Sequence, residues 1–153
     1  MISAEAIAMK SVIDIRLFLE SDRLACQAIA AHAQMSSYGP TMPAIRHTFV
    51  PSTPLESVER RWVATLEGRP VGFIDVNGAH IENLFVAPEA QSAGIGTALV
   101  AFVEERVGPM LTLSVFKVNV RARALYERLG FKVEAGAVIR FRGSEQYILS
   151  MRK

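Results

Sequence analysis

Residues 81–106, IENLFVAPEAQSAGIGTALVAFVEER, constrain the fold of this chain more than any other stretch. A short apolar run over residues 84–86 stops before Pro88, and a polar turn then leads into Gly94-Ile95-Gly96. Beyond the glycines, apolar residues recur with the 3.6-residue period of one helical face, at Ile95, Ala98, Leu99, Phe102 and Val103. The sequence therefore predicts a strand, a glycine-rich turn and a helix in immediate succession.

Such a turn is typical of an anion site. The first turn of a helix has backbone N–H groups without an intrahelical partner, and the helix dipole adds positive charge there. Glycines at positions 94 and 96 would let a phosphate approach the backbone without a Cβ in the way. We therefore expect a phosphate-bearing ligand at the start of this helix.

The composition is that of an ordinary globular domain. Half of the 153 residues are apolar and 21% are charged, and no apolar run reaches the roughly 18 residues of a membrane span. We expect a single folded domain over residues 11–153, preceded by a loosely ordered N-terminal extension over residues 1–10. Translation could start at Met1 or at Met9, and the sequence leaves that choice open.

Charge and cysteine content narrow the partners and the compartment. The net charge of +2, without a basic block, argues against nucleic acid as the main partner, and we expect no membrane partner. The single cysteine, Cys26, excludes an internal disulfide framework, and no signal-peptide pattern is seen, so we predict a cytoplasmic protein. Its apolar neighbours are typical of a buried, inert thiol and not of a nucleophile.

Strands are predicted over residues 12–19, 61–66, 71–76, 80–86, 110–116, 131–141 and 147–151. We expect one helix between Asn119 and Gly130 and another over residues 24–35, whose apolar side is formed by Leu24, Ala28, Ala31 and Met35. Residues 36–54, which are interrupted by prolines and Gly39, predict a long irregular segment and a candidate acceptor-substrate region. The strands on either side of the glycine-rich helix form a right-handed βαβ unit if they are parallel neighbours.

Two motifs together carry a family resemblance. Gln91-x-x-Gly94-x-Gly96 follows a strand, and Asn119 followed by LYERLGF over residues 125–131 comes after the next strand. With these motifs the chain resembles the GNAT superfamily of acyl-CoA-dependent N-acyltransferases, in element order from about residue 11 to the C-terminus and most specifically over residues 84–131. The resemblance implies a mixed α+β fold. Its central sheet would be mostly antiparallel, with about six to seven strands, helices on both faces, and a splay between two central parallel strands.

The resemblance also implies the cosubstrate, acetyl-CoA as acyl donor, and no metal. In the family the CoA pyrophosphate is held by backbone N–H groups of the glycine-rich turn, here Gln91, Ser92, Ala93, Gly94, Ile95, Gly96 and Thr97. The strand before the turn, here Leu84, Phe85 and Val86, pairs with the pantetheine arm. One N–H near Val86 would polarise the thioester carbonyl.

Two further positions are implied by the second motif. Tyr126 takes the place of the general acid that protonates the departing CoA sulfur, and a phenol of reference pKa about 10 is protonated at neutral pH. Because Tyr126 also falls on the apolar stripe of its helix, packing is the alternative. Asn119 matches the residue near the pantetheine or thiol, and it could instead be a helix cap or do both.

The general base is less strongly indicated. Glu82 lies on the strand that leads to the carbonyl site, where some family members place a carboxylate or a water relay, although it could be an exposed strand glutamate. His80 is the reserve candidate, whereas His32 and His47 have no motif support. No Cys/His/Asp cluster has metal-ligand spacing.

The acceptor amine is not identified by the sequence. The segments that set it in the family offer Tyr38, Arg46, His47, Phe49, Trp62 and Arg140 as possible pocket residues. Arg46 and Arg140 could clamp a carboxylate, or their stems could simply cover apolar surface.

The sequence thus favours an N-acetyltransferase that moves acetyl from acetyl-CoA to a primary amine of a small molecule or a protein, by direct attack in a ternary complex. The alternative from another class is a non-catalytic acyl-CoA-binding regulatory module. A toxin that acts on aminoacyl-tRNA is a third hypothesis, and the lack of a basic block argues against it. A homodimer through the final strands or the first helix is a further expectation.

Overall fold

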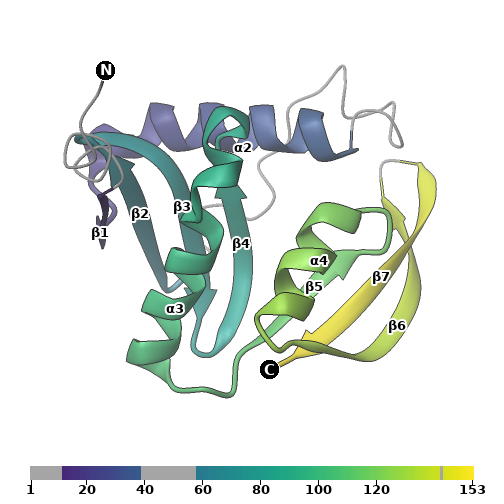
Figure 1. Ribbon diagram of the computed structural model, residues 1–153. Coiled ribbons are helices and arrows are strands. Elements are labelled where there is room, and N and C mark those ends of the chain that lie inside the picture. Colours follow the sequence, from purple (N-terminus) through teal and green to yellow (C-terminus); the bar gives the residue numbers. More distant parts are fainter. Residues whose placement is uncertain (1–11, 39–57, 142) are drawn as a thin grey trace, which may run out of the picture.

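The computed structural model describes residues 12–38, 58–141 and 143–153. These residues form one seven-stranded sheet in the order β1-β2-β3-β4-β5-β7-β6 (Figure 1). The strands are β1 Ile13–Leu17, β2 Arg60–Leu66, β3 Arg69–Asn77, β4 His80–Val86, β5 Thr112–Phe116, β6 Lys132–Phe141 and β7 Ser144–Arg152. The helices are α2 Arg23–Tyr38, α3 Ile95–Val107 and α4 Val120–Arg128, with 3-10 turns η1 Glu20–Asp22 and η4 Pro88–Ala93.

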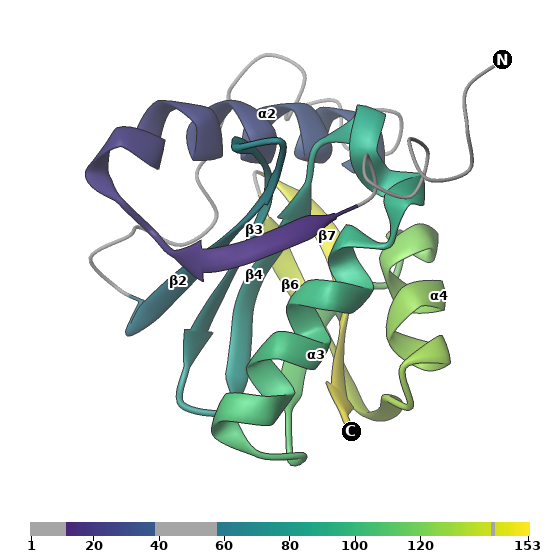
Figure 2. The same cartoon turned by 60° about the vertical axis from the view of Figure 1, so that its left-hand side comes forward.

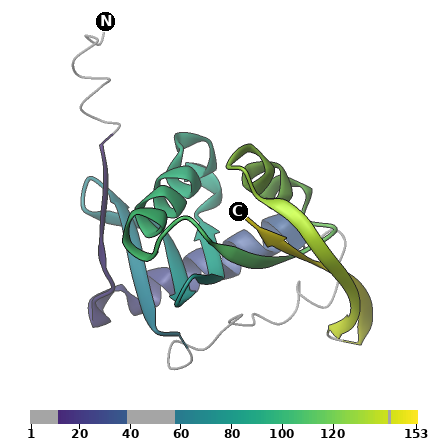
Figure 3. The same ribbon diagram turned by 90° about the horizontal axis from the view of Figure 1, so that it is seen from below.

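The predicted fold class is confirmed. Neighbouring strands pair antiparallel throughout the sheet, except that β4 and β5 are parallel. Helices α3 and α4 lie next to each other on one face of the sheet, and α2 covers the other face (Figures 2 and 3). The predicted βαβ unit is therefore β4-α3-β5, and the predicted final hairpin is β6-β7.

Helix α3 packs closely on the sheet through its predicted apolar face. Ile95, Leu99 and Val103 are fully buried. A Cβ on Gly72 of β3 would lie 3.0 Å from both Ile95 Cγ2 and the Phe85 carbonyl oxygen. Glycine at position 72 thus lets the first turn of α3 lie close to β3 and to the end of β4.

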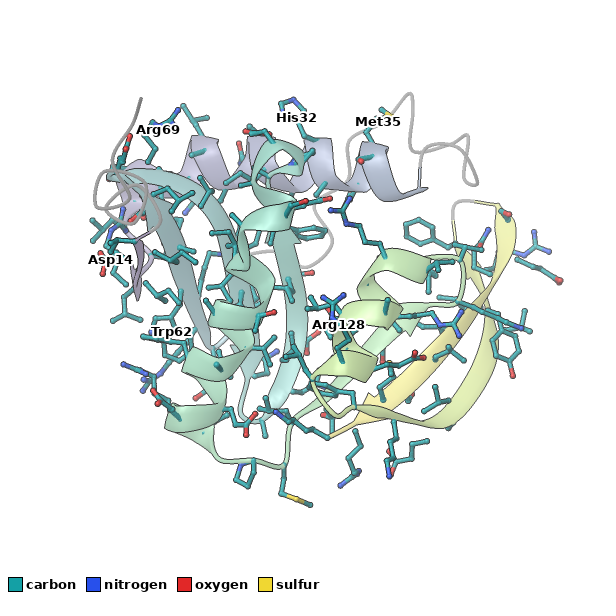
Figure 4. All side chains as sticks on the ribbon, in the orientation of Figure 1. Asp14, His32, Met35, Trp62, Arg69 and Arg128 are labelled. Carbon is teal, nitrogen blue, oxygen red and sulfur yellow. The ribbon has the colours of Figure 1, made fainter. Side chains whose placement is uncertain are left out.

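The predicted apolar side of α2 is wrong. Leu24 is 79% exposed and Met35 is 42% exposed, and Met35 and His32 point away from the sheet in Figure 4. The side that packs on β3 and β4 consists of Cys26, Ile29, Ala30 and Ala33. Both sets of residues satisfy a helical period, and the structure buries the set whose small side chains bring the helix close to the sheet.

Strands β4 and β5 separate soon after they meet. They pair only at His80↔Thr112 and Ile81↔Leu113, and Figure 1 shows them diverging from there. On the other side of β4, the register with β3 shifts between Asp75 and Val76, and Glu82 is left without a partner on β3. A bulge of this kind bends its strand and increases the twist, so β4 turns away from β5 at Glu82. This confirms the predicted splay.

Two predicted segments lie wholly or partly outside the described residues, and one helix is longer than predicted. The N-terminal extension, residues 1–10, and residues 39–54 of the predicted irregular segment lie outside the described residues. Helix α2 continues to Tyr38, beyond its predicted end at Met35. Among the helices that the structure describes, none has the length and hydropathy to cross a membrane.

The buried side of α2 can be tested by two substitutions in the same helix. Ile29→Ala removes a side chain that is 6% exposed, and it should lower the free energy of unfolding by about 2–5 kcal/mol through the cavity it leaves. Leu24→Ala should change it by no more than about 0.5 kcal/mol, because that side chain already faces water. Urea unfolding followed by circular dichroism measures both, and equal losses would contradict the packing described for α2.

Candidate active site

A cavity of about 790 Å³ lies where β4 and β5 diverge. Its wall is formed by β4 from Ile81 onward, the η4 turn, the start of α3, the end of β5 and one side of α4, together with two residues of α2, two of β6 and one of β7. The bulge and the splay therefore produce the opening, and residues from distant parts of the chain meet around it.

The glycine-rich turn opens α3 at this cavity. Gly94 is the N-cap and has a φ of 80°, in the left-handed region that favours glycine. The Ala98 N–H donates to the Gly94 carbonyl oxygen at 3.0 Å. The N–H groups of Ile95, Gly96 and Thr97 precede that bond, so they belong to the first turn and have no acceptor within the helix. The turn thus has the donors that an anion site requires.

Gly96 has a packing role that the sequence did not reveal. A Cβ there would lie 3.0 Å from Leu125 Cδ2 of α4, so glycine lets the two helices close around one end of the cavity. Of the residues predicted to bind the pyrophosphate, those that line the cavity are Gln91, Ser92, Gly94, Gly96 and Thr97. Ala93 and Ile95 do not line it, and the Ile95 side chain is buried against Gly72.

The end of β4 presents backbone groups to the cavity. Val86 accepts a hydrogen bond on its carbonyl oxygen from Gln91 Nε2 at 3.2 Å, whereas the next residue, Ala87, donates its N–H to the Val71 carbonyl oxygen of β3. Because successive strand residues turn their backbone groups to opposite sides, the N–H groups of Val86 and Leu84 face away from β3. Leu84, Phe85 and Val86 all line the cavity.

Helix α4 brings Tyr126 and Asn119 to the same cavity. Tyr126 is 7% exposed, and its ring packs edge-on against Phe131 with centroids 5.6 Å apart. Asn119 caps α4, because its side chain accepts a hydrogen bond from the Ala122 N–H at 3.2 Å. The packing of Tyr126 and the capping by Asn119 were both anticipated as alternatives, and the structure shows that each coexists with a place on the cavity wall.

Glu82 and His80 are separated by the structure. Glu82 lines the cavity at the bulge, and its Oε1 accepts a hydrogen bond from Asn77 Nδ2 at 3.1 Å. His80 lies where β4 and β5 still pair, and its Nδ1 is 2.8 Å from Thr112 Oγ1. It is not among the residues that line the cavity, so the geometry favours Glu82 over His80 as the base.

The predicted acceptor residues are not at this cavity where the structure describes them. Trp62 packs edge-on against Phe102 of α3, 5.6 Å between centroids, and Figure 4 shows it on the far side of α3 from α4. Arg140 is exposed and donates to the Gly143 carbonyl oxygen. Neither Trp62 nor Arg140 lines the cavity, and a role for Arg140 with the acceptor stays a prediction. Arg46, His47, Phe49 and the Tyr38 side chain lie outside the described part of the chain.

Other cavity residues were missed. Arg121 and Arg128 of α4 line the cavity, and Figure 4 labels Arg128 beside α4. Their spacing of seven residues, on the helix that carries Tyr126, was a signal that could have been read from the sequence. Residues from α2, β4, β5 and the final hairpin had no such signal: Ala33, Gln34, Asn83, Ser114, Phe116, Ile139, Phe141 and Ile148.

Cys26 is not part of the site. It is 1% exposed, on the side of α2 that packs on the sheet. Burial raises the pKa of its thiol to about 11, an effect that the nearby Arg61 guanidinium only partly opposes. The thiol is therefore protonated near neutral pH, which confirms the predicted inert character. Within residues 12–38, 58–141 and 143–153, no group of three or more His, Cys, Asp or Glu residues is placed to hold a metal ion.

A sheet splayed between parallel strands, with a glycine-rich helix start and a tyrosine at the opening, defines the class of acyl-CoA-dependent N-acyltransferases. A profile of the Acetyltransferase (GNAT) family matches residues 26–131. The chain belongs to the GNAT family of acetyltransferases. This membership confirms the predicted resemblance and the predicted activity, transfer of an acetyl group from the cosubstrate acetyl-CoA to an amine.

Known proteins resemble this chain over most of its length. The peptidyl-lysine N-acetyltransferase YjaB of Escherichia coli (strain K12) is 33% identical over 111 residues, which cover 71% of this chain and 71% of that protein. The solution structure of apo-form YjaB from Escherichia coli has a TM-score of 0.74 at 26% identity, covering 92% of this chain and 97% of that one. PaiA N-acetyltransferase from Thermoplasma acidophilum, in complex with coenzyme A, shares the fold with a TM-score of 0.69 at 20% identity, over 90% and 98% of the two chains.

The state of Cys26 gives a test of whether an acyl-cysteine intermediate is formed. The native protein should resist a thiol reagent at pH 8 and react in denaturant, and Cys26→Ala should keep the wild-type kcat. Because the folded pKa lies above the ordinary 9.0, the stability contribution of the protonated thiol is present below pH 9 and is lost as the pH rises toward 11. Loss of turnover in Cys26→Ala, with an unchanged melting temperature, would contradict this description.

Proposed function

We propose that this chain transfers the acetyl group of acetyl-CoA to the side-chain amine of a lysine in a protein, by direct attack within a ternary complex. The observation that carries the proposal is that Glu82 on β4 and Tyr126 on α4 line one cavity, so a base and an acid are available to a single reaction. The lysine acceptor is supported by the likeness to YjaB, a peptidyl-lysine N-acetyltransferase.

The donor would be held along the α3 and α4 side of the cavity. The phosphates of CoA are anions, and the first-turn N–H groups of Gly96 and Thr97, which line the cavity, are donors for a pyrophosphate. Arg121 and Arg128 add positive charge to the same wall. The pantetheine arm would pair with the backbone groups of Leu84 and Val86 that face away from β3. Asn119 lines the same cavity and would lie beside the arm.

Glu82 would act as the general base. A lysine amine has a reference pKa of about 10.4, so it is mostly protonated at neutral pH and cannot attack until a proton is removed. Glu82 takes that proton at the bulge, where the Asn77 amide holds its carboxylate. The nitrogen lone pair then attacks the thioester carbonyl carbon.

Tyr126 would act as the general acid. Attack places negative charge on the carbonyl oxygen, which a backbone N–H of the β4 end, near Val86, stabilises. When the carbon–sulfur bond breaks, the Tyr126 hydroxyl donates its proton to the departing sulfur. As the intermediate collapses, the nitrogen releases its surplus proton to solvent, so the products are the acetylated amine and CoA. Glu82 returns its proton to solvent, and Tyr126 is reprotonated from solvent.

The remaining cavity wall suits the stem of a lysine. It is largely apolar, with Phe85, Ile139 and Ile148, and with Phe116 packed against Phe141 at 5.2 Å between ring centroids. Among the described residues that line the cavity, Glu82 is the only carboxylate. One carboxylate matches one ammonium group on an aliphatic chain better than it matches a polyamine, which would need several.

The reaction would take place in the cytoplasm, as the single reduced thiol of Cys26 also suggests. The homodimer stays a prediction, which size-exclusion chromatography with light scattering tests.

Substitution of the base and the acid should separate the two chemical steps. Glu82→Gln should lower kcat by about 10²–10⁴-fold at pH 7, and the deficit should shrink as the pH approaches 10 because the free amine then needs no base. Tyr126→Phe should lower kcat at every pH and leave acetyl-CoA affinity unchanged. Steady-state assays of CoA release over pH, with calorimetry for acetyl-CoA binding, measure both effects.

Glu127→Gln is the matched control, because that carboxylate is exposed on α4 next to Tyr126 and does not line the cavity. It should keep the wild-type pH profile. Full turnover by Tyr126→Phe with normal acetyl-CoA binding would remove the acid role from Tyr126. A pH-independent deficit in Glu82→Gln would likewise contradict the role of Glu82 as base.

An acceptor screen tests the function as a whole. Lysine peptides should release CoA thiol from acetyl-CoA at least tenfold faster, in kcat/KM, than spermidine or an amino-acid α-amine of equal concentration. Tight acetyl-CoA binding without turnover on any amine would instead favour the regulatory module. Faster turnover of spermidine than of lysine peptides would contradict the proposed acceptor.

A further inference from the structure

Three polar side chains form a row across the face of the sheet that α2 covers. Arg61 of β2, Asp75 of β3 and Asn83 of β4 are successive partners in the strand register. Arg61 donates to both carboxylate oxygens of Asp75, at 2.6 Å from Nε and 2.7 Å from Nη2. Asn83 Nδ2 donates to Asp75 Oδ2 at 2.8 Å.

This row is buried. Asp75 is 0% exposed and Asn83 is 6% exposed, and the Arg61 guanidinium lies over the Phe73 ring, 4.2 Å from its centroid. Burial lowers the pKa of Arg61, but the hydrogen bonds and the charge of Asp75 more than offset it, so the net change is upward. Arg61 Nε and Asp75 Oδ1 form a salt bridge at 2.6 Å. Buried ion pairs add little to stability compared with apolar residues of the same size, so the row needs another explanation.

The row determines how the Asn83 side chain is oriented. A carboxylate can only accept hydrogen bonds, so the NH₂ group of Asn83 must face Asp75. Asn83 also lines the cavity, and in β4 it directly follows Glu82, the residue that has no partner on β3. Since Asp75 lies on the β3 side of Asn83, the carbonyl oxygen, Oδ1, is the polar atom left to face the cavity on the β5 side.

We propose that Asn83 Oδ1 accepts a hydrogen bond from the attacking amine and orients it toward the thioester, with Asp75 and Arg61 as positioning residues. This rests on the proposed function, in which Glu82 removes a proton from the same nitrogen. A lysine ammonium has three N–H donors. Glu82 takes one proton, Asn83 Oδ1 holds a second, and the lone pair is thereby directed at the carbonyl carbon.

Asn83 cannot replace Glu82, because an amide oxygen accepts a hydrogen bond without taking up a proton at neutral pH. Its contribution is to binding and orientation.

Asn83→Leu keeps a similar side-chain volume and removes both polar atoms. For a lysine peptide we expect the KM to rise about tenfold or more, as expected for a lost hydrogen bond to a charged donor, while the KM for acetyl-CoA stays at the wild-type value. Gln146→Met is the matched control: it replaces a buried amide of β7 that does not line the cavity, and it should change neither KM.

The positioning role is tested by removing the ion pair as a unit. Arg61→Met combined with Asp75→Leu leaves no unpaired buried charge, so the double variant should fold. It should raise the KM of the lysine peptide as Asn83→Leu does. A changed melting temperature with an unchanged peptide KM would show that the row is merely structural.

A binding measurement keeps this test independent of turnover. The probe is a bisubstrate compound in which the lysine Nε of a peptide is joined through an acetyl linker to the CoA sulfur. Asn83→Leu should weaken the bisubstrate at least tenfold more than it weakens CoA alone.

If Asn83→Leu weakens the binding of the bisubstrate compound and of CoA equally, or changes neither affinity, the proposed role of Asn83 is overturned. If wild-type protein shows no turnover and Asn83→Leu still weakens the bisubstrate selectively, the proposed function fails and the Asn83 contact stands.

Discussion

The separation of β4 from β5 is the feature on which the rest of this structure depends. Two residue pairs hold the strands together, and the bulge at Glu82 then bends β4 away. In a continuous sheet, the backbone groups of β5 would occupy the side of β4 that now borders the cavity. The divergence thus provides the cavity, the free strand edge and the exposure of Glu82. The lack of a Cβ on Gly96 lets α4 pack close to the start of α3 beside that cavity.

Charge is distributed along the cavity in an order that fits acetyl transfer. Cations and helix N–H groups lie on the α3 and α4 side and one carboxylate lies at the bulge, while the rest of the wall is mainly apolar with a few neutral polar side chains, Asn83 among them. An anionic donor and a cationic acceptor would therefore be drawn to different ends of one space. The buried Arg61–Asp75 pair holds the NH₂ group of Asn83 on the β3 side, which in our proposal leaves Oδ1 to face the cavity.

How well the sequence predicted each element depended on how many arrangements its pattern allowed. Helix α3 has one apolar stripe, so Ile95, Leu99 and Val103 were assigned correctly to the core. Helix α2 offers two stripes, and the wrong one was chosen. In β2, residues 62–65 are all buried, so alternation could not show that Trp62 faces α3 and not the cavity. Asn83 had no motif at all, because its importance comes from neighbours on β2 and β3 that are distant in the chain.

The sequence by itself determined the element order, the glycine-rich turn and the family, and it singled out Glu82 and Tyr126, which the structure places on one cavity. These depend on local properties: periodicity, the left-handed backbone conformation that Gly94 can adopt, and short motifs whose residues lie close together in the sequence. The tertiary structure alone decided which face of α2 is buried, that His80 stays at the paired base of β4 while Glu82 reaches the cavity, and that Arg61 and Asp75 orient Asn83. Those outcomes follow from strand register and from a one-residue bulge, and register is a relation between segments that no single stretch of sequence contains.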